Sequence, residues 1–193
     1  MKTLFFKYKQ NAFTLLEAII ILAFLILLLF ALYALYINIS HYSNRQIKRL
    51  ELAQNSRIIL DRMSREIRQT SKIISILPET KDEEGNPPLN EIKFQNGHNL
   101  NPVQYIRYYQ DNFFIKRTVS HYFFSVNPDL WVVYDSVDTE GNPPIEEITE
   151  DEVIGEYIDS TRIYGKTLVT IEIDLIKDQE KLYLKSRAGG RNL

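Results

Sequence analysis

One uninterrupted apolar stretch dominates the pattern of hydrophobic and polar positions along the chain. Every residue from Ala18 to Ile37 is apolar or aromatic, and no Asp, Glu, Lys or Arg occurs between Ala18 and Asn44. Twenty helical residues at about 1.5 Å each span about 30 Å, which is the thickness of the hydrocarbon core of a bilayer. The pattern therefore predicts a transmembrane helix over Ala18 to Ile37, directly after the carboxylate of Glu17.

The pattern becomes amphipathic after a polar segment at 38–44. Apolar side chains then recur at spacings of four or seven residues, which places them on one face of a helix; they are Leu52, Ile59, Met63, Ile67 and Ile74. No Pro or Gly occurs between Phe13 and Leu77, and Pro78 ends this stretch. We therefore expect one long helix that continues to Leu77 and packs its apolar stripe on a sheet.

Strand patterns dominate the chain after Pro78. Apolar and polar residues alternate over short segments, and the loops at 110–112 and 177–179 suit hairpins. The predicted strands are 91–95, 103–109, 113–120, 131–134, a mixed segment at 153–163, 167–176 and 180–187. Within 167–176 we expect Leu168, Thr170, Glu172 and Asp174 to lie on a solvated face and the residues between them to lie on a buried face. A helix followed by antiparallel strands is an α+β fold, here a long N-terminal transmembrane and spine helix packed on an antiparallel β-sheet.

Two segments rich in Gly and Pro have the same form. The chain reads E-G-N-P-P-L-N-E-I at 84–92 and E-G-N-P-P-I-E-E-I at 140–148. Gly and Pro mark both segments as surface turns. Nothing else repeats around them, which favours one kind of turn used twice over a duplicated interaction loop.

Glu17 is the residue that simple interpretations of the N-terminus leave unexplained. A secretory signal peptide has an apolar core of about 7–15 residues and a small-residue cleavage site, whereas this run is longer and no A-x-A-like site follows Ile37. A plain signal anchor explains the apolar run. It does not explain a carboxylate at its start, which costs up to about 3 kcal/mol within a membrane unless the carboxylate has a partner.

The residues around Glu17 resemble the N-terminal signal of type IV pilins and pseudopilins. The segment 12–17 reads A-F-T-L-L-E, follows a leader with three lysines and precedes the apolar run. The resemblance implies that a prepilin peptidase cuts between Ala12 and Phe13 and that Phe13 becomes the N-methylated first residue. It also implies that Glu17 pairs with the N-terminal amine of a neighbouring subunit during assembly. The family usually has Gly before the cut, where this chain has Ala12, another small residue.

The resemblance also implies how the chain is divided. A leader peptide covers 1–12 and a transmembrane helix covers 13–39. The amphipathic continuation of the spine helix covers 40–77. An extracytoplasmic, β-rich pilin head covers 78–193.

Weaker motifs resemble the larger minor subunits of that family, such as the J-type pseudopilins of type II secretion. They are D-R-M-S-R-E-I-R at 61–68, R-Y-Y at 107–109 with a later K-R at 116–117, and R-N at 191–192. Together they favour a minor subunit over a major pilin.

On this resemblance the protein is a structural subunit of a type IV pilus or a type II secretion pseudopilus, and not an enzyme. Its expected partners are other pilin or pseudopilin subunits, the prepilin peptidase, the inner-membrane assembly platform and membrane lipid. The N-terminus lies in the cytoplasm, with a single pass through the cytoplasmic (inner) membrane and the head outside. Basic residues are nearly balanced across the apolar run, so this orientation rests on the resemblance. The alternatives are a membrane-anchored extracytoplasmic binding or sensory domain with an uncleaved anchor, and a major pilin.

Composition limits the classes of function. The chain of 193 residues contains no Cys, so no disulfide stabilises the head. Without the leader, 20 basic residues face 25 acidic ones, which gives a net charge of −5. An acidic mature chain is a poor nucleic-acid binder, and we predict no nucleic-acid partner.

No pattern of residues predicts a catalytic, metal or cofactor site. His41, His98 and His121 have no metal-binding spacing, and no nucleophile elbow, P-loop or dinucleotide fingerprint is present. The acidic clusters at 82–84 and 146–152 lack the calcium-loop pattern, so we expect solvated loops. A group of aromatic residues occurs at strand positions, namely Tyr105, Tyr108, Tyr109, Tyr122, Phe123 and Phe124. We expect these side chains to be half-buried in a sheet rather than to form an exposed aromatic patch.

Overall fold

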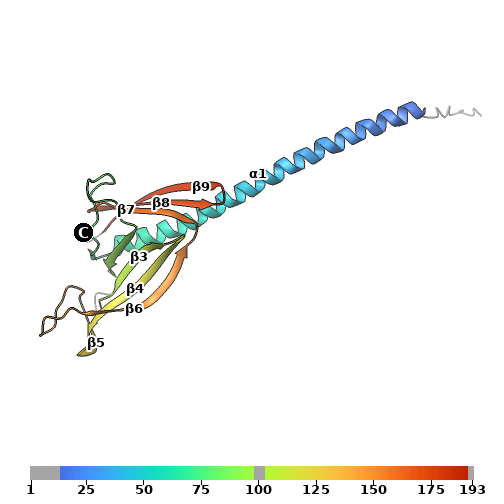
Figure 1. Ribbon diagram of the computed structural model, residues 1–193. Helices are drawn as coiled ribbons and strands as arrows, with labels where there is room; N and C mark the ends of the chain where they lie inside the picture. The colour runs from blue at the N-terminus through green and yellow to red at the C-terminus, as the bar shows by residue number, and fades with distance from the viewer. Residues whose placement is uncertain (1–13, 98–102, 191–193) are drawn as a thin grey trace, which may run out of the picture. The chain divides into compact units, whose positions relative to one another are not determined.

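The computed structural model describes residues 14–97 and 103–190. A single helix, α1 (Leu15–Gln69), is continuous over 55 residues and is followed by nine strands within this part of the chain (Figure 1). The chain divides into two units, one ending at Gln46 and the other beginning at Ile47. The first unit contains the apolar part of α1, which is long and apolar enough to span a membrane. The layout is α+β, as predicted.

The helix ends at Gln69 and not at Leu77. The Thr70 hydroxyl donates to the carbonyl oxygen of Gln95 over 2.7 Å and accepts the amide of Lys72 over 3.3 Å, which turns the backbone out of the helix. The next residues form β1 (Lys72–Ile73), which pairs antiparallel with β2. β-Branched residues such as Ile73 suit a strand as well as a helix, and here the strand pairing decides. The expected helical continuation is wrong for residues 70–77.

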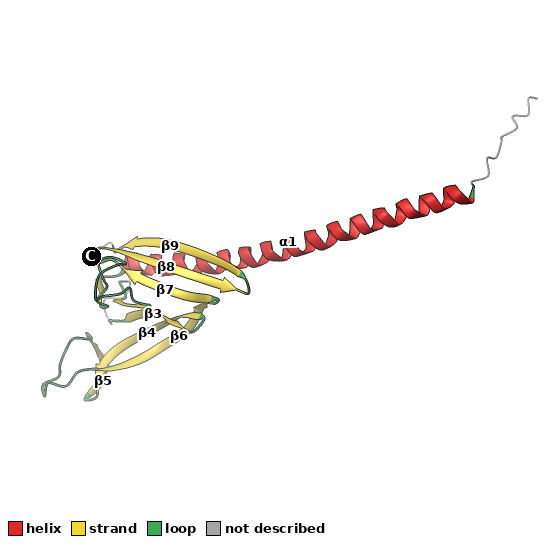
Figure 2. Cartoon of the chain, turned by 45° about the horizontal axis from the view of Figure 1, so that its top comes forward, coloured by secondary structure: helices red, strands yellow, loops and turns green. Residues whose placement is uncertain are grey.

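Sheet A is antiparallel and contains six strands. Its order is β1-β2-β3-β4-β5, and β6 pairs with the other side of β4. The strands after β1 are β2 (Glu91–Gln95), β3 (Tyr105–Asp111), β4 (Phe114–Phe124), β5 (Asn127–Val132) and β6 (Ile145–Gly155). The views in Figures 1 and 2 show β5 and the β5–β6 connection at the end of the sheet where β4 ends and β6 begins.

Sheet B is antiparallel and contains three strands in the order β7-β8-β9. They are β7 (Ile158–Tyr164), β8 (Leu168–Lys177) and β9 (Glu180–Gly189). An isolated bridge between Leu89 and Ile163 links β7 to the segment that leads into β2. The Ile158 amide also donates to the Phe113 carbonyl over 3.0 Å. The two sheets are therefore connected on the side of β7, which leaves β6 and β9 as strands with one unpaired side.

One hydrophobic core joins the second half of α1 to both sheets. Leu52, Ile59, Met63 and Ile67 are completely buried, which confirms four of the five residues of the predicted stripe. The fifth, Ile74, lies beyond the end of the helix and is half-buried. Sheet A contributes Ile92, Phe94, Ile106 and Tyr108 to this core. Sheet B contributes Ile171 and Ile173. The second half of the helix therefore lies at the centre of the unit that begins at Ile47, which is called the head from here on.

The strand β6 was not predicted. We expected the acidic residues 146–152 in solvated loops, but they form most of an 11-residue strand. Basic residues of neighbouring strands offset the carboxylates: Arg117 on β4 lies 3.0 Å from Glu150, and Lys93 on β2 lies 2.7 Å from Glu146. The other predicted strands are present, with ends displaced by up to four residues, and the mixed segment 153–163 is divided between the end of β6 and most of β7.

The two repeated segments form the same kind of turn. Gly85 and Gly141 both have a positive φ, 78° and 83°, which a residue with a side chain rarely adopts. In each turn the Asn after the Gly donates its side-chain amide to an earlier carboxylate: Asn86 to Glu83 over 3.3 Å and Asn142 to Asp138 over 2.9 Å. The repeat is therefore turn chemistry used twice, as expected.

The aromatic group is packed into sheet A. Tyr105 and Tyr108 are buried, and the remaining four side chains are half-buried. Tyr105 meets Tyr122 and Tyr134 edge to face, with ring centres 5.2 and 5.8 Å apart. These contacts confirm sheet positions and exclude an exposed patch made by these residues.

Candidate functional site

The N-terminus of α1 contains a reciprocal pair of hydrogen bonds between Thr14 and Glu17. The Thr14 amide donates to Glu17 Oε2 over 3.2 Å, and the Glu17 amide donates to Thr14 Oγ1 over 3.3 Å. This is a capping box, in which each side chain satisfies a backbone N–H that the helix leaves unpaired. The predicted cleavage residues Ala12 and Phe13 lie outside the described residues.

The helix that follows Glu17 presents an apolar surface that no other described part of the chain covers. The large hydrophobic side chains from Ile19 to Ile37 are 37–69 % exposed. Monomeric proteins in water rarely leave an apolar surface of this extent uncovered. This half of α1 therefore requires lipid or other apolar surfaces around it.

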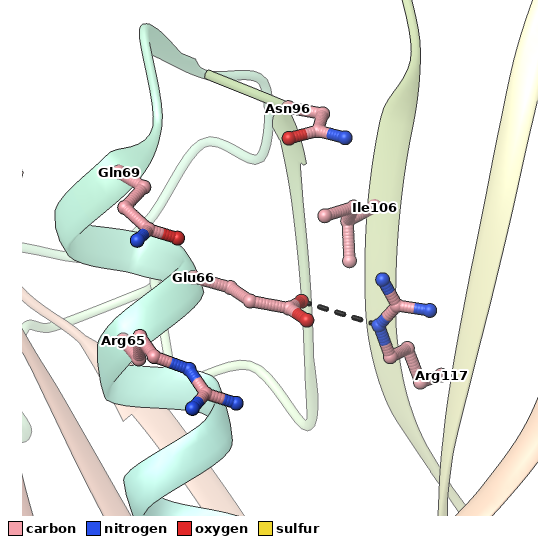
Figure 3. A pocket seen from close by; sticks show the side chains of 6 residues that line it. All are labelled: Arg65, Glu66, Gln69, Asn96, Ile106 and Arg117. Carbon is pink, nitrogen blue, oxygen red and sulfur yellow. Dashed lines mark hydrogen bonds and ion pairs between the residues drawn. The ribbon is translucent and has the colours of Figure 1, made fainter. Parts of the chain in front are cut away.

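The head contains a polar pocket of about 300 Å³ between α1 and sheet A. Figure 3 shows Glu66 extending from α1 toward Arg117 on β4, with Arg117 Nε 3.2 Å from Glu66 Oε2. The remaining lining residues are Arg65, Gln69, Asn96 and Ile106. The pocket thus contains a carboxylate and guanidinium that already satisfy each other.

Arg117 is the centre of an ionic cluster that links three elements. Its Nη1 lies 3.0 Å from Glu150 and 3.2 Å from Glu152 on β6, in addition to Glu66 on α1. Burial alone would lower the pKa of Arg117, but these carboxylates outweigh burial and raise it. The Tyr108 hydroxyl donates to Glu66 over 2.6 Å, and burial followed by this bond raises the pKa of Tyr108. Both groups therefore stay protonated, and the arrangement suits a structural link better than proton transfer.

A second ionic cluster surrounds Glu172 on the outer face of sheet B. We expected this face to be solvated, yet Glu172 is only 2 % exposed. Its carboxylate accepts Tyr164 over 2.7 Å and lies 3.0 Å from Lys185, with Arg162 and Lys81 each at 3.3 Å. Burial alone would raise the pKa of Glu172, but these bonds, led by those from Tyr164 and Lys185, lower it well below its usual range. Lys81 belongs to the Pro-rich connection before β2, so this connection and the side chains of Arg162, Tyr164 and Lys185 together enclose a carboxylate that the alternation predicted as exposed.

The histidines and acidic clusters form no metal site within the described residues, although His121 lies beside one cluster. His41 is exposed, and His98 lies outside the described residues. The His121 ring stacks on Trp131 with centres 4.0 Å apart, and its Nε2 lies 3.3 Å from Glu147. Within the residues that the structure describes, no group of three His, Cys, Asp or Glu side chains could hold a metal ion.

Comparisons with protein-family models, curated proteins and solved structures gave no match. Function must therefore be argued from the residues and geometry of this chain.

Some of these features have signals in the sequence that the prediction did not use. The capping box is visible as T-x-x-E immediately before the apolar run. Arg117 occupies an inward position between Ile115 and Val119, both of which are buried, and a charge at such a position indicates a buried ionic partner. The partner itself, Glu66, is separated from Arg117 by 51 residues and has no local signal.

Proposed function

We propose that this protein is a structural subunit of a filament of the type IV pilin or pseudopilin class, assembled through its N-terminal helix. One observation carries the proposal. A single helix presents an uncovered apolar surface in its first half and supplies the core of a head in its second half. The F-T-L-L-E signal places the acid at the start of that surface.

The uncovered surface of α1 has two uses in this proposal. Before assembly it lies in the membrane as a single anchor. In the filament it packs against the same helices of other subunits, because a surface that is stable in lipid is also stable against apolar side chains. The head then stays outside the cytoplasmic membrane, with the N-terminus in the cytoplasm.

Glu17 provides the register of assembly. Removal of residues 1–12 by a prepilin peptidase would create a new amine at Phe13, which is then methylated. A carboxylate and an ammonium satisfy each other in a low-dielectric bundle, where either alone is costly. The Phe13 amine of a neighbouring subunit is therefore the proposed partner of Glu17, with the assembly platform delivering one subunit to the next. The resemblance of 61–68 and 107–109 favours a minor subunit, and abundance in purified filaments separates this from a major pilin.

A second candidate is a membrane-anchored binding or sensory domain with an uncleaved helix. The capping box favours it, because Glu17 then has a local structural reason to be present. The ionic clusters of the head are equally compatible with both candidates.

Two measurements test the proposal on the protein from its native membrane. Intact-mass and N-terminal peptide spectrometry should find a chain that begins at N-methylated Phe13, whereas a chain that retains residues 1–12 contradicts the proposal. Incorporation into filaments is then compared between Glu17→Gln and Glu17→Val. Gln also suits the third position of a capping box, so Glu17→Gln removes the charge and retains the cap. Loss of incorporation in both variants supports pairing with the amine, and normal incorporation of Glu17→Gln assigns Glu17 to capping alone.

A further inference from the structure

The strand β6 has an open edge. Among the strands of the described residues it pairs with β4 alone, on one side, and most of its side chains are exposed. Ile145, Ile148 and Val153 are each at least half exposed. Protein edges are usually protected by charged side chains, Pro, bulges or a very short strand. This strand has 11 residues and no Pro, and its protection consists of acidic side chains and of irregular pairing with β4 at Ile115/Lys116 and Val119/Ser120. Acidic side chains protect an edge against like charges but not against a basic strand.

The charge of β6 selects against pairing with itself. Five of its 11 residues are Asp or Glu, from Glu146 to Glu152. Two such strands side by side would place carboxylates opposite carboxylates, which is destabilising. Lys93, Arg117 and Arg62 already pair with Glu146, Glu150 and Glu152, but the five carboxylates still outnumber these three cations. The edge therefore disfavours a symmetric β6–β6 contact and suits a basic strand.

The strand β9 is such a strand within this chain. It pairs with β8 only, and its exposed residues include Lys181, Lys185 and Arg187. Beside it, an open groove of about 500 Å³ separates β9 from α1, with Leu50, Arg57, Leu60, Leu182, Leu184 and Lys185 among its lining residues. The groove combines an apolar floor with basic side chains, which matches the apolar and acidic side chains of β6.

We infer that β6 of one copy of this chain adds to the β9 edge of the next copy. The two strands have 11 and 10 residues, so they can pair over nearly their full length. The contact joins two different surfaces, and such head-to-tail contacts extend into open chains unless the rotation closes them into a ring. Main-chain hydrogen bonds provide the affinity, as in other cases of strand addition, and the opposite charges provide the direction. The inference rests on the proposed function, since it requires copies held next to one another in a filament.

The test uses the absence of Cys from the natural sequence. Asp151→Cys marks β6, and Lys181→Cys, Tyr183→Cys or Arg187→Cys marks β9 at three registers. Each variant is the full-length chain in its native membrane, and disulfides are formed with a mild oxidant. A chain that carries one Cys on each strand should give a ladder of dimers, trimers and larger species for at least one register. Coexpressed single variants with different tags should give mixed dimers only.

The controls separate the possible occupants of the edge. Lys166→Cys, an exposed position outside both strands, paired with Asp151→Cys should give no ladder. Dimers of Asp151→Cys alone would show β6–β6 pairing and overturn the inference. Absence of any ladder would overturn it too, and if the mature chain still begins at Phe13, the proposed filament function stands. A ladder from chains that retain residues 1–12 would instead support the pairing and contradict the proposed function.

A charge change tests the direction of pairing. Lys181→Glu combined with Arg187→Glu should lower the yield of the ladder about tenfold or more, since like charges then face each other across the edge. The matched change Lys166→Glu should leave the yield unchanged. If the yield of the ladder were the same with the double change, with Lys166→Glu and with neither change, recognition by charge would be contradicted.

Discussion

Arg117 on β4 and Glu66 on α1 form an ion pair, 3.2 Å from Nε to Oε2, with only 10 % and 15 % of their side chains exposed. The pair connects the helix to sheet A in a pocket that is otherwise lined by the polar residues Arg65, Gln69 and Asn96 and by Ile106. A pair in this position fixes how the sheet lies on the helix.

Removal of one partner of this pair should be costly. Glu66→Leu leaves the Arg117 guanidinium and the Tyr108 hydroxyl without their shared acceptor. Arg117→Met leaves Glu150 without its cation and leaves Glu66 and Glu152 with Arg62 alone. We expect each single change to lower the free energy of unfolding by about 3 kcal/mol. The fluorescence of Trp131, the single Trp of the chain, reports unfolding in detergent with urea. The double variant should lose clearly less than the sum, and additive losses would contradict a direct pair.

The Glu172 cluster predicts a pH dependence of stability. The folded pKa of Glu172 lies below its ordinary value of 4.5, so the folded state binds its proton less readily than the unfolded state. The stabilisation is therefore complete above the ordinary value and declines as the pH falls toward the folded pKa. Glu172→Gln should lower the free energy of unfolding by about 3 kcal/mol at pH 7. The difference between the two proteins should become smaller at pH 4 and smaller again at pH 3, whereas a difference that is constant with pH would contradict the prediction.

Gly97 is required by a close approach of two backbone segments. A Cβ built at Gly97 would lie 1.5 Å from the carbonyl oxygen of Gln69, at the point where α1 ends. Gly97→Ala should therefore destabilise the head by more than about 2 kcal/mol or prevent its folding, since backbone atoms must move. Gly189→Ala is the matched control, because its nearest contact is a side-chain atom at 3.5 Å. Equal thermal midpoints of the two variants would refute this assignment.

Truncation of a side chain on α1 should lower the free energy of unfolding strongly at a buried position of the stripe and weakly at an exposed position. Met63→Ala removes a completely buried side chain and should cost about 2–5 kcal/mol. Ile58→Ala, on the same helix, changes a side chain that is 61 % exposed and should change stability by less than about 0.5 kcal/mol. Denaturation of both proteins in the same detergent measures this difference.

The long helix and its stripe could be predicted because periodicity is a local property of the sequence. The end of the helix could not, since residues 70–77 are compatible with either state and β1 forms only through its pairing with β2. The acidic strand β6 was missed for a related reason. Its carboxylates look like loop residues until Lys93 and Arg117, which come from other strands, are placed beside them. Glu172 shows the same limit, because alternation does not reveal that Lys81 covers the outer face.

The N-terminal signal is a different case. The segment 12–17 and the apolar run are adjacent in the chain, so the resemblance and its implied residues could be recognised directly. The ionic network between Glu66 and Arg117 depends on contacts across 51 residues and could be found only in three dimensions.

The place of β9 in the head has a consequence for the order of events during synthesis. Ser64 on α1 meets Ser186 on β9 at 3.0 Å, although 122 positions separate them, and Ala188 on β9 is part of the core. The ribosome makes the apolar stripe of α1 before the strand that completes its cover. Until β9 is made, the stripe around Met63 therefore has no finished core to enter. Exposed apolar surface promotes aggregation, so the nascent chain carries that risk over the whole interval between α1 and β9.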